Sequence, residues 1–189
     1  MSGSFVASPS VAAEAGERPA PAWRRGIEWT AALALAAVWF GAGLWKLSDL
    51  TVTELKMTQA LVPRSVAFLA ALFFGAAETF AGVLLLVPRW RRWGALLSFG
   101  LLAAFMGYIG IHYGALRGAD CTCFPWLKRA IGPMFFVEDA ALMLVAVAAG
   151  IWTKPSSGWR RARLVLAAIL VFAGGMHAWN YTRDRKSVV

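Results

Sequence analysis

The chain contains two cysteines, Cys121 and Cys123, which are separated by one residue. They lie in residues 119–126, between stretches of strongly apolar sequence. Two thiols at this spacing can form a disulfide that closes a very small ring, and the strain of that ring makes the bond easily reduced. Zinc sites usually have two to four residues between paired cysteines, which does not match this spacing. The Cys-x-Cys pair therefore predicts thiol–disulfide exchange rather than a metal site.

The composition indicates a membrane protein. Hydrophobic residues make up 59% of the 189 residues and charged residues 15%, whereas a soluble domain carries about 25% charged residues. These polar residues are too few to cover the surface of a soluble globular protein. We therefore expect an all-α integral membrane protein. The net charge of +9 comes from basic residues in short runs beside apolar segments. Such runs are typical of membrane flanks and argue against a nucleic-acid partner.

The apolar segments predict the domain organisation. Short connections between the first four favour an antiparallel four-helix transmembrane bundle over residues 23–152, with a fifth C-terminal transmembrane helix after it. Residues 1–22, rich in small residues and proline, are expected to form a disordered cytoplasmic tail. A basic loop, the fifth helix and a short polar tail fill residues 153–189. The expected spans are residues 27–47, 65–87, 94–116, 133–152 and 164–179.

Basic residues in the connections set the expected orientation. The count is nearly even between the two sides, but dense clusters such as residues 89–92 fall on the side of the N-terminus. We therefore expect the N-terminus in the cytoplasm of a bacterium. The Cys-x-Cys loop is then expected on the outer, oxidising face of the inner membrane.

Polar side chains within or near the spans are further candidates. Asp139 lies one to two turns into the fourth segment, and His112 lies near the outer end of the third. We expect these two to carry protons or to raise the thiolate fraction of the cysteines. Lys46 is expected to extend outward from the first segment. Glu78 is expected to lie too deep to join this outer group, as either a functional carboxylate or a hydrogen-bonded packing residue.

Several segments resemble a known membrane family. Residues 40–49 are similar to the signature at the end of the first helix in DoxX-like proteins, and residues 78–86 to their second helix. Residues 120–124, followed by Asp139, are similar to the loop and fourth helix of the MauE branch. That branch usually has glycine at the position of Thr122 and after the phenylalanine, where this chain has proline. The resemblance covers roughly residues 27–152.

This resemblance implies a redox-associated inner-membrane protein, linked to electron transfer or to disulfide formation in exported partners. We therefore predict thiol–disulfide exchange between the Cys-x-Cys pair and an exported or membrane protein, and we leave open whether this makes the chain an oxidoreductase. Coupling to membrane quinone stays open too, because one cysteine pair cannot relay electrons alone. One alternative is a non-catalytic subunit or assembly factor of a larger membrane complex. A metal site built from both thiolates and histidine is a third hypothesis.

Overall fold

A computed structural model describes residues 21–121, 129–154 and 159–187. Apart from two strands of two residues each, every regular element in these ranges is a helix. The elements are α1 (Ala22–Ser48), α2 (Leu50–Gln59), α3 (Arg64–Leu86), α4 (Arg91–Ile111), α5 (Tyr113–Leu116), β1 (Asp120–Cys121), β2 (Arg129–Ala130), α6 (Pro133–Gly150) and α7 (Trp159–Ser187).

Five of these helices are long and apolar enough to cross a membrane, namely α1, α3, α4, α6 and the part Ala162–Thr182 of α7. Large apolar side chains such as Leu69, Phe73 and Leu144 are exposed on the outside of the molecule, where lipid can cover them. The chain is therefore a multi-pass membrane protein. The predicted all-helical class with five spanning segments is confirmed.

Four of the spanning helices contact one another in a ring, in which α1 and α4 each pack against both α3 and α6. We call α1, α3, α4 and α6 the four-helix ring. Its core holds many alanines, since small residues let helices approach closely within a membrane. The buried residues of this core are Ala32, Leu35, Ala36, Trp39, Ala81, Leu85, Ala95, Leu101, Leu102, Ala146 and Ala149. The buried Trp39 Nε1 donates a 2.8 Å hydrogen bond to Ser98 Oγ, so its polar atom is satisfied.

Two glycines set the position of α1 along α3. A Cβ atom on Gly43 would lie 2.7 Å from the backbone nitrogen of Thr79 and 2.9 Å from the carbonyl oxygen of Gly75. A Cβ atom on Gly75 would lie 2.8 Å from Leu47 Cδ2. Only glycine allows backbones to pack this closely. The last turns of α1 therefore lie beside the middle of α3, roughly 16 Å from its first residue at about 1.5 Å per residue.

The connection between the first two spans contains a helix, α2, in addition to the five spans that the sequence predicted. Asp49 caps it by accepting a 3.0 Å hydrogen bond from the Val52 amide. Leu50, Thr53 and Met57 form its buried face, which packs against α3. Because α1 ends beside the middle of α3, α2 covers the first half of α3. An acidic cap followed by residues at helical spacing is the signal that sequence reasoning missed.

The third predicted span is shorter than expected. α4 ends at Ile111, and the short helix α5 continues only from Tyr113 to Leu116. His112 lies at the break, where its backbone N–H donates to the carbonyl of Tyr108. Several glycines in residues 107–114 lower helix propensity here, which explains the early end. His112 therefore joins two helices rather than lying within one.

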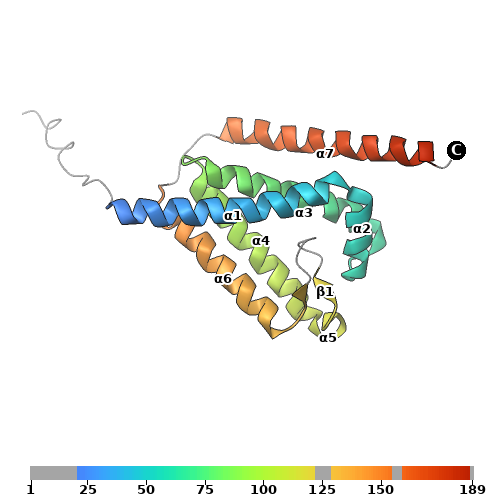
Figure 1. The fold of residues 1–189 in the computed structure, drawn as a ribbon, viewed down its shortest axis with the longest axis horizontal. Helices are drawn as coiled ribbons and strands as arrows, with labels where there is room; N and C mark the ends of the chain where they lie inside the picture. The colour runs from blue at the N-terminus through green and yellow to red at the C-terminus, as the bar shows by residue number, and fades with distance from the viewer. Residues whose placement is uncertain (1–20, 122–128, 155–158, 188–189) are drawn as a thin grey trace, which may run out of the picture.

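The fifth span, α7, lies alongside α1 and α3 at the edge of the molecule (Figure 1). Its buried face contains Ala162, Ile169 and Ala173, which pack in the same core cluster as residues of α2 and α3. Near its far end, Asn180 Nδ2 donates to the carbonyl of Ser48 at the end of α1. α7 (Trp159–Ser187) is longer than the predicted residues 164–179, because polar residues on both sides of the apolar stretch continue the helix.

Candidate functional site

Cys121, the first residue of the Cys-x-Cys pair, lies on one of two paired strands between α5 and α6, and we call these two strands the hairpin. Strands β1 and β2 pair antiparallel, with Asp120 opposite Ala130 and Cys121 opposite Arg129. Cys123 lies outside the described residues, as does the remainder of the segment 122–128. The backbone of the first cysteine is thus held by strand pairing. The hairpin lies at the same end of the molecule as α5 and α2 (Figure 1).

Hydrogen bonds and apolar packing anchor this hairpin to the helices. The Gly118 amide donates to the Ile131 carbonyl and the Ile131 amide donates to the Ala119 carbonyl, each at 2.9 Å. Gly118 has a φ of +80°, a conformation that favours glycine. Below the strands, a buried apolar cluster joins α4, α5 and α6 and consists of Ile109, Leu116, Ile131 and Phe135. These contacts hold the hairpin in place against α4, α5 and α6.

His112 lies at this same end of the molecule. Its ring packs on the ring of Tyr108 with centroids 4.5 Å apart, and its Nδ1 lies 3.0 Å from the Tyr108 carbonyl oxygen. The Tyr108 hydroxyl in turn donates to the Ala60 carbonyl at the end of α2, at 2.9 Å. The imidazole is therefore oriented by α4 and is half-buried.

Asp139 and Lys46 do not lie where the sequence predicted. Both were expected near the outer rim with the cysteines, but both are buried inside the four-helix ring, with exposed fractions of 5% and 2%. Lys46 Nζ contacts both carboxylate oxygens of Glu78, at 2.8 and 3.0 Å. Glu78 is itself only 1% exposed. The expectation that Lys46 extends outward and that Glu78 stands apart from it is therefore wrong.

The physical reason for this difference is the position of α1 along α3. The glycine contacts bring the end of α1 to the level of Gly75, so Lys46 meets a carboxylate roughly 20 Å along α3 at about 1.5 Å per residue. Thr53 Oγ1 on α2 donates a 3.1 Å hydrogen bond to the Lys46 carbonyl. This bond attaches α2 to the end of α1, next to the Lys46–Glu78 pair. The sequence contained one signal for the pair, namely opposite charges in two consecutive apolar segments.

Glu78 and Asp139 line a common cavity of about 20 Å³ between the helices of the four-helix ring. Its other lining residues are Leu35, Val38, Trp39, Ala42, Leu102, Phe105 and Leu142. This volume has room for about one water molecule. A quinone ring is several times larger than water, so this cavity does not accept one.

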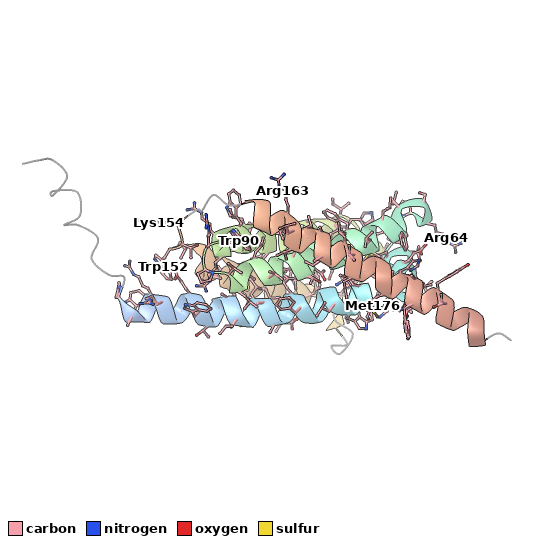
Figure 2. All side chains as sticks on the ribbon, turned by 90° about the horizontal axis from the view of Figure 1, so that it is seen from above. Arg64, Trp90, Trp152, Lys154, Arg163 and Met176 are labelled. Atoms are coloured by element: carbon pink, nitrogen blue, oxygen red, sulfur yellow. The ribbon has the colours of Figure 1, made fainter. Side chains whose placement is uncertain are left out.

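The end of the molecule opposite the hairpin gathers basic and aromatic residues. The guanidinium carbon of Arg91 lies 3.9 Å from the centroid of the Trp29 ring, and its Nε donates to the Leu85 carbonyl at 3.1 Å. Arg24 lies 5.8 Å from the centroid of the Trp152 ring. Trp90, Trp152, Lys154 and Arg163 all lie toward this end, whereas Arg64 lies at the other (Figure 2). Cation–π contacts thus fix part of this basic end.

Comparison with known proteins gives one positive result. The family described as methylamine utilisation protein MauE has a model that matches residues 24–153 of this chain. The match includes the four-helix ring, α2, the hairpin and both cysteines, and it stops before α7. No curated protein and no solved structure matches the chain.

Proposed function

The chain belongs to the MauE family, and from this premise we propose that it is a membrane redox protein that exchanges disulfides with exported partners through Cys121 and Cys123. The observation that carries the proposal is the hairpin. Its first cysteine lies on a paired strand, anchored on a buried apolar cluster at one end of the membrane helices. A reactive thiol pair is served by a fixed backbone, and the strand pairing of Cys121 supports the proposal on this point.

The proposed exchange balances without a further oxidant. A thiolate of the partner attacks one sulfur of the Cys121–Cys123 disulfide, which forms a mixed disulfide and releases the other sulfur as a thiolate. The second thiol of the partner then attacks the mixed disulfide. The partner leaves with a disulfide, and the Cys-x-Cys pair is left as two thiols.

The direct test is a single-turnover reaction with a reduced dithiol peptide. We expect the purified, oxidised protein to form one peptide disulfide per protein molecule without added oxidant, because the strained ring is a strong acceptor. Mass spectrometry of the quenched peptide measures the yield. A single Cys121→Ser or Cys123→Ser variant should instead give no peptide disulfide, since it has no internal disulfide.

The double Cys121→Ser/Cys123→Ser variant is the control for adventitious oxidation. If the double variant matches the wild-type yield, or the wild type forms no peptide disulfide, the exchange proposal is wrong. The alternative role as a non-catalytic subunit or assembly factor then gains support, provided that the double variant still copurifies with a membrane complex at fixed stoichiometry.

His112 and Asp139 are proposed as proton carriers for this exchange. The position of His112 at the hairpin end supports a direct role, whereas the burial of Asp139 supports an indirect one. We expect His112→Gln to slow the single turnover by about 10²-fold without lowering the final yield, because general acid–base groups change rates and not stoichiometry. Stopped-flow kinetics measures the rate. An unchanged rate would remove His112 from the mechanism.

The cysteines are proposed to lie outside the bacterial inner membrane, with the N-terminus in the cytoplasm. The dense basic cluster in residues 89–92 supports this orientation, because Lys and Arg next to the ends of membrane helices favour the cytoplasmic side. After mild reduction, we expect a membrane-impermeant maleimide added to intact cells to label the cysteines. A cysteine-free variant carrying Lys154→Cys should be labelled only after permeabilisation. The reverse pattern would invert the proposed topology.

A further inference from the structure

The basic end of the molecule brings together the ends of three spanning helices. α1 begins at Ala22, α4 begins at Arg91, and α6 ends at Gly150. The Trp23 and Trp152 rings pack with their centroids 6.1 Å apart, so the start of α1 lies beside the end of α6 (Figure 2). Both rings are partly exposed, and tryptophan side chains favour the interface between lipid and water. These helix ends therefore meet at the level of the lipid headgroups.

Two exposed arginines flank the residues that follow α6. The guanidinium carbon of Arg24 lies 5.3 Å from the centroid of the Trp23 ring and 5.8 Å from that of the Trp152 ring. On the side of α4, Arg92 Nη1 donates a 3.5 Å hydrogen bond to the Thr153 carbonyl oxygen. Within the part of the chain that the structure describes, this is the one hydrogen bond that the two guanidinium groups make. Because each guanidinium has five N–H donors, most of their donors are left for a ligand.

The charge around these two arginines is strongly positive. The three segments that meet here, residues 21–30, 88–93 and 150–154, contain six basic side chains and one acid, Glu28. A surface with such an excess of one sign attracts groups of the opposite sign. At the surface of a membrane these groups are the phosphates of anionic lipids.

Helix capping explains only part of this arrangement. A positive charge is favourable at the C-terminal end of a helix, which accounts for the bond between Arg92 and the carbonyl of Thr153. It does not account for Arg24, which lies against two exposed indole rings at the start of α1. A guanidinium can donate two parallel charge-assisted hydrogen bonds to a phosphate, so a phosphate ligand accounts for both arginines.

We propose that Arg24 and Arg92 bind the headgroup phosphate of an anionic phospholipid beside the end of α6. Their guanidinium groups donate hydrogen bonds to the phosphate oxygens, and no covalent bond changes. The site does not depend on the proposed disulfide exchange, because neither cysteine belongs to it. Nor does it depend on the orientation of the chain, because each leaflet of a membrane contains phospholipids.

Native mass spectrometry of the purified full-length protein in detergent tests the proposal. Phosphatidylglycerol and phosphatidylcholine are titrated separately, since both contain a phosphate but only the first carries a net negative charge. We expect the wild type to bind phosphatidylglycerol more tightly than phosphatidylcholine. Arg24→Gln/Arg92→Gln should raise the dissociation constant for phosphatidylglycerol by about 30-fold, which corresponds to about 1 kcal/mol per arginine.

Arg64→Gln/Arg117→Gln is the matched control, because it removes the same charge from two exposed positions, at the start of α3 and after α5. It should bind phosphatidylglycerol as the wild type does. Arg24→Lys/Arg92→Lys should bind with an intermediate affinity, since lysine keeps the charge but not the paired hydrogen bonds.

The proposal is overturned if the wild type binds both lipids equally. It is also overturned if Arg24→Gln/Arg92→Gln binds phosphatidylglycerol as tightly as the wild type. Equal losses in this variant and in Arg64→Gln/Arg117→Gln would overturn it too, because they would indicate a general effect of net charge. Circular dichroism checks that the variants are folded, and the comparison of the lysine variant with the wild type decides should the glutamine variant fail to fold.

Discussion

Replacing Lys46 by methionine is expected to lower the free energy of unfolding by about 3–5 kcal/mol. The substitution leaves the buried Glu78 carboxylate without the ammonium group that contacts both of its oxygens. The carboxylate must then stay charged in the membrane interior or take up a proton, and either outcome is less favourable than the pair. Because proton uptake is easier in acid, the deficit should shrink as the pH falls. Denaturant unfolding in mixed micelles, repeated at several pH values, measures this loss in the free energy of unfolding.

A double-mutant cycle separates the interaction energy of the Lys46–Glu78 pair from the contributions that each side chain makes with its other neighbours. Lys46→Met combined with Glu78→Leu should be more stable than Lys46→Met alone, since no uncompensated charge remains. Lys56→Met is the matched control, because its ammonium lies over Trp45 on the half-exposed surface of α2. It should cost no more than about 1 kcal/mol. Equal stability of Lys46→Met and the wild type would show that the pair contributes nothing to holding α1 and α3 together.

Gly43→Ala is the second substitution with a large expected effect. Its new Cβ would meet the side chain and backbone of Thr79 and the backbone of Gly75, and backbone atoms cannot rotate away. Overpacking of this kind costs typically about 1–3 kcal/mol. The shift of α1 should also lengthen the Lys46–Glu78 contact, so we expect the upper part of this range. Thermal unfolding of the purified variant checks the prediction.

Gly26→Ala provides the same change on the same helix without the clash. Among the described residues, and apart from the adjacent turns of α1 itself, no atom lies within 4 Å of a Cβ on Gly26, so this variant should match the wild type or gain up to about 1 kcal/mol from better helix propensity. If both variants melt at the wild-type temperature, the close approach of α1 and α3 does not limit stability.

The membrane class and the number of spans could be predicted from the sequence because they depend on composition. Uninterrupted apolar stretches must form helices in lipid, whatever their neighbours are. The end of α4 at Ile111 and the extension of α7 to Ser187 were less predictable. Both depend on small propensity differences at glycines and polar residues, which packing can override in either direction.

The site was predictable only where local sequence determines it. The two cysteines and a turn between apolar segments are visible in the chain, and the MauE likeness now stands as family membership. The grouping of Lys46 with Glu78 and Asp139 was not visible, because it depends on how far α1 advances along α3. A slide of one helical turn would move Lys46 by about 5 Å and break its contact with the carboxylate. The glycines that fix this position become informative only once the partner helix is known.

The ion pair between α1 and α3 also bears on how the chain enters the membrane. Lys46 and Glu78 belong to the first two spans in chain order, and synthesis proceeds from the N-terminus. The two charges can therefore meet while α4, α6 and α7 are still being translated. α1 and α3 can then partition into lipid with this pair of opposite charges neutralised. An isolated first span would have to carry an unpaired ammonium group into the bilayer.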